Sequence, residues 1–328
     1  MTIKFNNVYV ENVSTVAGPF VIEGPLKDNF DKKFTDFYDG EKTFEKCEMK
    51  ELKESIKILL DKTKYNEEDI SFGISADLMN QLTISNFVYS KLNIPFLGVY
   101  NACASVCEEI LIASSILENE KNKKAICTTS SHNMTSERQF RNPVEYGAPK
   151  PKTTTFTVTG AASLMLTNAK TDIKVTNATI GKVIDMGVDN VFDMGAVMSP
   201  SAAYTLNEHL KQTKTKVSDY DLILTGDLGV YGKDIFKEIC EKEYNIKLDK
   251  NYDDTATMIY DYKENIYAGG SGPACMPLVV YSSIIPKMKQ RIIKKVLLIA
   301  TGALMSPTTC NQKFSIPSVS HAVCLEVI

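Results

Sequence analysis

One cysteine in this sequence stands where an enzyme could place a nucleophile. Cys103 begins the apolar helical pattern "CASVCEEILIASSIL" and follows the short apolar run "IPFLGVY". At a helix N-terminus, free N–H groups and the helix dipole favour a reactive thiolate. The alternative is a cysteine that only packs, because free Cys is among the most buried residue types. The position in the motif favours a residue that lines a pocket.

Catalysis by such a thiol would need a base and a group that stabilises an oxyanion beside it. The sequence has three histidines. His132 follows a predicted strand and His321 precedes the last one, so either could lie at a pocket edge. A lone histidine is as often a structural hydrogen-bonding group. His209 falls inside the amphipathic stretch "NEHLKQTK" and is expected at the surface.

Two aspartates, Asp77 and Asp227, each end a predicted strand, where α/β folds build their crevices. An aspartate after a strand also commonly caps the following helix. For Asp77 the pocket and capping roles stay open, and one carboxylate can serve both. For Asp227 we favour capping or repeat symmetry.

A run of polar side chains closes the predicted strand "AICTT". Ser130, Ser131, His132 and Asn133 follow one another there. A turn rich in Ser and Asn is the ordinary interpretation. The run would also supply the donors that a carboxylate ligand needs.

Arginine is almost unused in this chain. Of 37 basic residues only three are Arg, and Arg138 and Arg141 lie three positions apart. The planar guanidinium fork suits a carboxylate better than lysine does. We therefore expect carboxylate partners for both, either from the ligand or from acids such as Glu137 and Glu145.

The composition excludes several classes of protein. A net charge of −3 and the absence of a basic stripe with interleaved aromatics argue against a nucleic-acid partner. No signal peptide or membrane span is visible, so we expect a soluble protein made in the cytoplasm. Eight scattered cysteines without C-x-x-C predict reduced thiols, and we expect no metal and no cofactor.

The elements that must position these residues occur twice. The segment "AAYTLNEHLKQTKTKVSDYDLILTGDL" repeats the order helix, polar link, strand, Asp-Leu of "KILLDKTKYNEEDISFGISADL". "GGSGPACMPLVVYSSII" then matches "NACASVCEEILIASSIL", which pairs Cys103 with Ser271, and "KKVLLIATGAL" matches "KKAICTTSSHN". The ordered set predicts two duplicated α/β halves, 1–170 and 171–328, in one compact body.

The paired helices predict how the halves pack. Residues 271–286 carry no charge, and 103–117 carry only Glu108 and Glu109. A helix that is apolar nearly all round is buried on both sides. Together with an amphipathic helix at 50–64, this predicts a five-layer α-β-α-β-α sandwich.

A duplicated unit whose buried central helix begins with cysteine resembles the thiolase and ketoacyl-synthase superfamily. A closer resemblance, to the stage V sporulation protein AD family of endospore-forming bacteria, covers almost the whole chain. It is carried by "AGPFVIEGPL", "IPFLGVYNACAS", "TSSHNMTSERQFRNPVEYGAPKP", "DYDLILTGDL", "YAGGSGPAC" and "ATGALMSPTTCNQKFSIPSVSHAV". It implies a thiolase-like protein that binds dipicolinic acid (pyridine-2,6-dicarboxylic acid). It further implies a role beside membrane-embedded stage V proteins, peripheral to the spore inner membrane, in moving that acid into and out of the spore.

The chain departs from the thiolase pattern where catalysis needs it. The G-H-P-x-G turn that supplies a thiolase histidine reads "AGGSGPAC" here, and the first-half G-G-x-E reads "SSHN". We therefore predict a non-catalytic binding protein whose pocket includes Asp77, Cys103, the 130–133 run and His321. A Cys103-dependent acyltransferase or condensing enzyme is the alternative, and a scaffold with an unused pocket is a third. Whether calcium accompanies the ligand, and whether the chain forms a homodimer, stays open.

Overall fold

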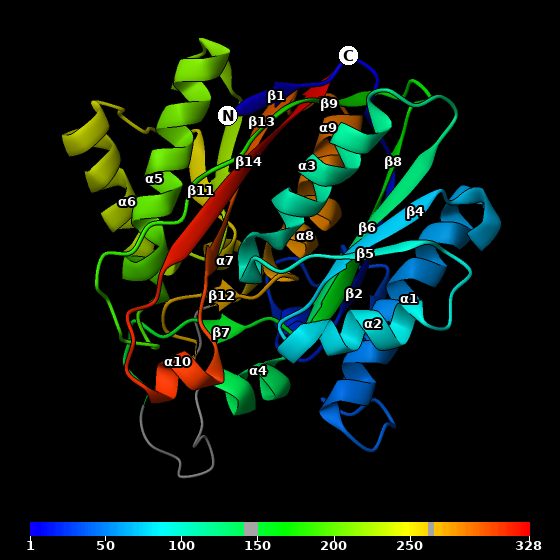
Figure 1. Ribbon diagram of the computed structural model, residues 1–328, viewed down its shortest axis with the longest axis horizontal. Helices are drawn as coiled ribbons and strands as arrows, with labels where there is room; N and C mark the ends of the chain where they lie inside the picture. Colours follow the sequence, from blue (N-terminus) through cyan, green and yellow to red (C-terminus); the bar gives the residue numbers. More distant parts are fainter. Residues whose placement is uncertain (141–149, 262–265) are drawn as a thin grey trace.

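The computed structural model describes residues 1–140, 150–261 and 266–328 of the chain. Within them, twelve strands form one mixed sheet with two equivalent halves (Figure 1). From the middle outward, the first half runs β2 (Tyr9–Ala17), β8 (Gly160–Thr167), β6 (Lys124–Ser131), β4 (Phe72–Ala76), β5 (Phe96–Gly98). The second half runs β9 (Ile173–Thr179), β14 (Ser318–Val327), β13 (Lys295–Ala303), β10 (Leu222–Thr225), β11 (Tyr252–Asp254).

The halves meet at the two central strands. β2 and β9 pair antiparallel only at Tyr9↔Lys174 and Val10↔Ile173. Two short strands flank them, β1 (Thr2–Lys4) on β9 and β3 (Lys32–Lys33) on β2. A separate parallel ladder joins β7 (Phe156–Thr157) to β12 (Gly270–Ser271), so a second contact ties one half to the other.

The repeat extends to the ends of the outer helices. α1 (Phe44–Thr63) and α5 (Met194–Thr213) each have 20 residues and end at a lysine in the left-handed conformation, Lys64 and Lys214 (φ 59° in both). A short 3₁₀ turn follows each helix. In it, Asp69 accepts the N–H of Asn66, as Asp219 accepts that of Lys216.

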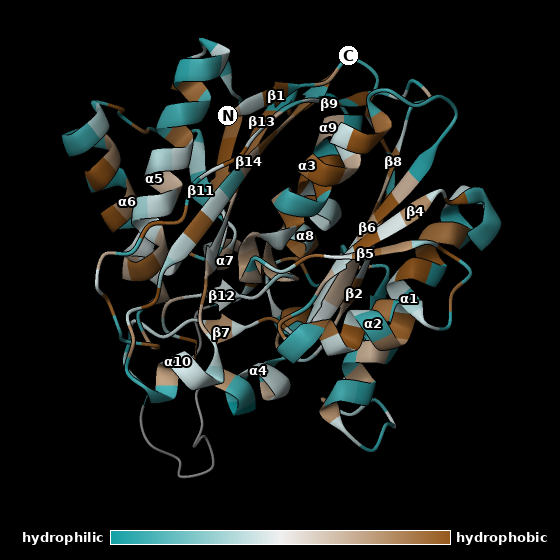
Figure 2. Cartoon of the chain, viewed as in Figure 1, coloured by the Kyte–Doolittle hydropathy of each residue, from teal (hydrophilic) through white to brown (hydrophobic). Residues whose placement is uncertain are grey.

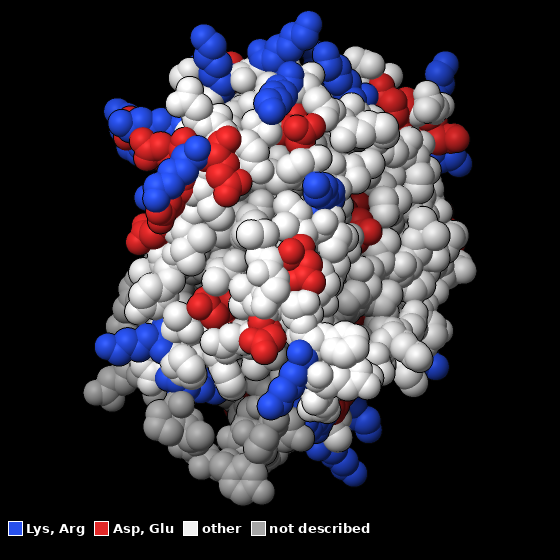
Figure 3. All heavy atoms as spheres, turned by 60° about the vertical axis from the view of Figure 1, so that its left-hand side comes forward, with Lys and Arg blue, Asp and Glu red and all other residues white. Residues whose placement is uncertain are grey.

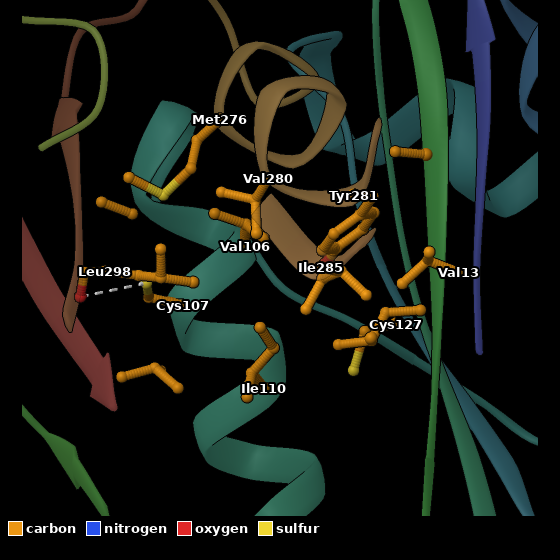
Figure 4. Packing of buried hydrophobic residues seen from close by; sticks show 14 of the residues in the cluster. Val13, Val106, Cys107, Ile110, Cys127, Met276, Val280, Tyr281, Ile285 and Leu298 are labelled. Carbon is orange, nitrogen blue, oxygen red and sulfur yellow. Dashed lines mark hydrogen bonds between the residues drawn. The ribbon is translucent and has the colours of Figure 1, made fainter. Parts of the chain in front are cut away.

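Two buried helices lie between the halves. α3 (Ser105–Leu117) belongs to the first half; its counterpart is α8 (Cys275–Val279), continued by a π turn (Val280–Ile284) and α9 (Ile285–Lys289). Figure 4 shows Val106, Cys107 and Ile110 of α3 packed beside Met276 and Val280, all members of one apolar core. The charge-poor sequences of both helices are explained by this position.

Amphipathic helices cover the two outer faces. α1 and α2 (Thr83–Tyr89) lie on the first half, and α5 and α6 (Gly229–Tyr244) on the second, which completes the five layers (Figure 1). In Figure 2 the brown, apolar sides of these helices face the sheet. The short helices α4 (Asn133–Phe140), α7 (Ala256–Ile259) and α10 (Pro307–Asn311) lie near the β7–β12 ladder.

His209 does not lie at the surface, as the sequence pattern predicted. It is fully buried on the sheet-facing side of α5, where Nδ1 pairs with Thr179 Oγ1 at 2.8 Å and Nε2 with Tyr220 Oη at 2.9 Å. Its polar ring is tolerated inside because both nitrogens have partners. Burial lowers the His209 pKa to about 4.

Candidate functional site

A small cavity lies where the two central helices begin. Its volume is about 40 Å³, roughly the room that three water molecules occupy. Cys103 lines it from one half, and Ser271 and Gly272 from the other. The remaining walls are mostly apolar: Leu78, Tyr100, Ala102, Ser136, Phe140, Thr157, Met194, Met198, Ala303 and Met305.

Uncommon backbone conformations converge on this cavity. Ala102, directly before Cys103, has φ 48°, Asp227 has φ 67° and Gly272 has φ 103°. Left-handed backbone at a non-glycine residue is costly and clusters at functional sites. At Gly302, in β13, a side chain would overlap the Asn101 carbonyl oxygen. The turn that carries Cys103 therefore packs directly against β13.

The carboxyl group of Asp227 interacts with Cys103 and Gly272, two residues that line the cavity. It is 1% exposed, and Oδ2 accepts the Gly272 N–H at 2.7 Å. Its other oxygen, Oδ1, is buried without an ordinary hydrogen-bond partner. Burial raises the Asp227 pKa to about 8, although the thiols of Cys103 and Cys275 oppose that shift as hydrogen-bond donors. The sequence analysis favoured capping or repeat symmetry for Asp227. Its carboxyl bonds to Gly272, which lines the cavity, although Asp227 itself is not among the lining residues.

Asp77 serves the capping role instead. Oδ1 accepts the Met79 N–H, and Oδ2 accepts both the N–H and the hydroxyl of Ser85 at 2.7–2.8 Å. These bonds fix the first turn of α2. Burial raises the Asp77 pKa, and the bonds from Ser85 and Met79 oppose that shift. Asp77 is not among the residues that line the cavity.

Ser130 and Ser131 are fully buried and hold the scaffold together. Ser130 Oγ donates to Glu48 at 3.0 Å, and Ser131 Oγ donates to the Val158 carbonyl at 2.7 Å. Burial raises the Glu48 pKa to about 8. Ser131 also backs Gly272, where a Cβ atom would approach Ser131 Oγ to 2.8 Å.

His132 and Asn133 are likewise occupied by the protein. His132 Nε2 pairs with the Phe37 carbonyl at 2.9 Å, and Nδ1 accepts the Met134 N–H at 3.3 Å. Burial lowers the His132 pKa to about 4. The Asn133 amide donates to the Thr157 carbonyl at 3.4 Å. Asn133 does not line the cavity itself. It bonds to the backbone of Thr157, which does.

His321 lies within β14 rather than before it. Gly181 N–H donates to Nδ1 at 3.2 Å, and Nε2 lies 3.1 Å from the amide nitrogen of Asn101. Burial lowers the His321 pKa to about 4. Asn101 belongs to the turn before Cys103. The ring thereby braces that turn and is not among the residues that line the cavity.

Of the two arginines, Arg138 has the predicted carboxylate partner. It forms an ion pair with Glu45 at the start of α1. Glu137 pairs with Lys150 at 2.7 Å. Arg141 lies outside the described residues.

Ser136 and Tyr100 are cavity residues that the sequence analysis missed. Ser136 Oγ is buried without a hydrogen-bond partner, which leaves a hydroxyl free for a ligand. Ser136 and Phe140 face the cavity from one side of α4, and their i, i+4 spacing is the sequence signal that could have indicated them. No local pattern marks Tyr100, whose pKa burial raises to about 12.

A second, outer cavity adjoins the first. It has a volume of about 170 Å³ and is lined by Asn80, Gln81, Leu82, Gln139, Ser306 and Pro307. Tyr100, Phe140 and Met305 line both cavities. These three side chains therefore form a partition between an outer cavity that has several polar side chains and a mostly apolar inner one.

The described residues contain no group of three or more His, Cys, Asp or Glu side chains placed to hold a metal ion. In the same residues, no helix combines the length and apolar character that crossing a bilayer requires. On the face drawn in Figure 3, acidic and basic side chains are interspersed along the upper and left edges, a few acidic side chains lie near the middle, and the right-hand part is largely uncharged.

Solved structures of low identity share this fold. 3-Oxoacyl-[acyl-carrier-protein] synthase III from Aquifex aeolicus superposes with a TM-score of 0.59 at 13% identity, covering 97% of this chain and 99% of that one. OleA from Xanthomonas campestris with bound cerulenin gives 0.61 at 13% identity, covering 99% and 98%. At such identity the likeness establishes a thiolase-like fold.

Sequence relatives are much closer. The family model for Stage V sporulation protein AD (SpoVAD) matches residues 1–326. Stage V sporulation protein AD of Bacillus subtilis is 40% identical over 319 residues, which is 97% of this chain and 94% of that protein. With Cys103 at the head of a buried central helix in a thiolase-like fold, the chain belongs to the stage V sporulation protein AD family.

Proposed function

We propose that the protein binds dipicolinic acid in the cavity at Cys103 and does not turn over an acyl group. Family membership supports the ligand class, as it supports work beside membrane-embedded stage V proteins at the spore inner membrane. The surroundings of Cys103 support binding rather than catalysis.

The observation that carries this proposal is the group beside the thiol. All three histidines are buried and engaged elsewhere, and none is among the residues that line the cavity. The thiol faces the buried carboxyl of Asp227 instead. A nucleophile without a positioned base loses about 10²–10⁴-fold in rate.

The lining is compatible with a planar aromatic acid. Mostly apolar walls with a few fixed polar groups are typical of small-molecule sites. The Ser136 hydroxyl can donate to a carboxylate, since it has no partner in the protein. The cavity is smaller than a pyridine ring with two carboxyl groups, so binding must displace side chains. Met194, Met198 and Met305 are the adaptable ones.

Calorimetric titration with dipicolinate, beside a benzoate control, tests this proposal. We expect dipicolinate to bind and benzoate to bind at least ten-fold more weakly, because one carboxyl is missing. Parallel titrations with calcium added show whether the cation offsets repulsion between Asp227 and a dianion.

Ser136→Ala should weaken dipicolinate about five-fold, the effect of one hydrogen bond of about 1 kcal/mol. Ser90→Ala is the matched control, because its exposed hydroxyl bonds only to the Phe87 carbonyl, away from the cavity. Equal affinity of both variants and the unchanged protein would place the ligand elsewhere.

Mass spectrometry after incubation with acetyl- and malonyl-coenzyme A tests the absence of turnover. We expect no acyl mass on the protein. A stable adduct on Cys103, or thioester turnover abolished by Cys103→Ala, would establish the acyltransferase alternative.

A further inference from the structure

The buried carboxyl of Asp227 links the two halves at the site. Its Oδ2 accepts from Gly272 N–H, while the thiols of Cys103 and Cys275 lie within donating reach of the carboxyl. Cys103 lines the cavity, and Cys275 is fully buried as the first residue of α8. A carboxyl group with one oxygen that lacks an ordinary hydrogen-bond partner is costly to bury. The backbone of Asp227 is also in the left-handed conformation, which is costly for a residue other than glycine. Fold stability alone does not account for it.

We propose that Asp227 is a positioning residue that keeps the Cys103 sulfur protonated and therefore not nucleophilic. The inference rests on the proposed binding function and deepens it, because it names what holds the thiol inactive. The carboxyl oxygen accepts the S–H of Cys103 and directs that proton away from the cavity. The sulfur then presents only lone pairs to a ligand.

Electrostatics support this arrangement from every side of the carboxyl. The titratable groups that act with Asp227 are Cys103, Cys275, Asp254 and Tyr260, all of which become negative when they ionise. With a pKa of about 8, the Asp227 carboxyl takes its negative charge only as pH rises through about 8. A thiolate would be a second negative charge in the same buried space, and such coupled groups resist the second ionisation.

The rate of Cys103 alkylation by iodoacetamide as a function of pH tests the proposal, with peptide mapping to identify the modified cysteine. Asp227→Asn is the main variant, because asparagine tolerates a left-handed backbone and keeps an acceptor for Gly272 N–H. We expect its midpoint to lie at least one pH unit below that of the unchanged protein. The rate at pH 7.5 should rise about ten-fold. The midpoint does not depend on how freely the reagent reaches the cavity.

Two controls separate this effect from general loosening of the fold. Asp77→Asn alters the equivalent carboxyl of the other half and should leave the Cys103 profile unchanged. Cys310, which is partly exposed on α10, is an internal reference whose profile should not move in any variant. If Asp227→Asn fails to fold, Asp227→Gly removes the carboxyl while suiting the positive φ.

An unchanged or higher midpoint in a folded Asp227 variant would overturn the proposal. So would an equal shift in Asp77→Asn. Neither outcome depends on dipicolinate, so the result stands apart from the calorimetric test of function.

Discussion

Asp77 and Asp227 follow equivalent strands of the two halves and hold different partners. Asp77 accepts two backbone N–H groups and a hydroxyl and fixes the start of α2. In the second half, Asp254 on the neighbouring strand accepts the N–H groups of Leu228 and Gly229 at the start of α6. With that helix already capped, Asp227 turns toward Cys103. Because Asp254 caps α6, Asp227 is available to interact with Cys103.

The ends of β6 and β13 differ in the same way. Ser131 and Gly302 are equivalent by the sequence repeat, and each backs the beginning of the central helix that belongs to the other half. Ser131 contacts Gly272 through a side chain, whereas Gly302 contacts Asn101 through bare backbone. The turn at the start of the first central helix therefore packs closer to the strand behind it than its counterpart does. This turn carries Cys103.

Gly302→Ala should give the largest effect on this comparison. Its methyl group would overlap the Asn101 carbonyl, which cannot move without moving Cys103. We expect a loss of about 3 kcal/mol in the free energy of unfolding, measured by urea denaturation. Ser131→Ala, the equivalent position, should cost only about 1 kcal/mol through its lost bond to Val158. Equal losses in the two variants would show that the packing at Gly302 and at Ser131 is equally tight.

The aspartates should separate in the same assay. Asp77→Ala leaves the N–H groups of Met79 and Ser85 without their acceptor, and we expect a loss of about 2 kcal/mol. Asp227→Gly removes one acceptor and relieves the left-handed strain, so its loss should be under about 1 kcal/mol. The reverse order of stabilities would contradict the division of tasks.

The pH dependence of stability should also distinguish them. The folded state raises the Asp227 pKa from 3.8 to about 8, so between these values it binds more protons than the unfolded chain does. Stability therefore falls as pH rises through this window. Asp227→Asn should make the slope shallower between pH 5 and 8, by up to about 1.4 kcal/mol per pH unit. Unchanged slopes in thermal melts at four or more pH values would argue against a raised pKa.

The smallest expected effect concerns the titration of the three histidines, two of which the sequence analysis considered as candidate catalytic bases. Burial lowers the pKa of His132, His209 and His321 to about 4. In imidazole NMR spectra we expect no ring to titrate between pH 5.5 and 8. Because the unfolded rings protonate near 6.5, these groups add stability that is lost as pH falls below that value. A ring that titrates near pH 6.5 would revive the search for a base beside Cys103.

The fold could be predicted because its signals are long and repeated. Ordered blocks identified the duplication, and two helices nearly without charge identified the central layer. Boundaries were less accurate: α1 begins at Phe44, one to two turns before the predicted start at residue 50. The first turns of that helix carry several charges, so their apolar period is weak.

The site could be predicted only where a motif pointed at it. Cys103 lines the cavity as its place at a helix start indicated. The roles of Asp77 and Asp227 depend on Asp254, which is remote in sequence, and on a left-handed φ that no local pattern marks. The polar run at 130–133 looked like a set of ligand donors because sequence does not show that Glu48 and Val158 already bind its hydroxyls.

The partition formed by Tyr100, Phe140 and Met305 has a kinetic consequence. A ligand that reaches the inner cavity through the outer one has to displace these side chains both on arrival and on departure. The same barrier then slows association and dissociation alike. Shortening Met305 should accelerate both rates.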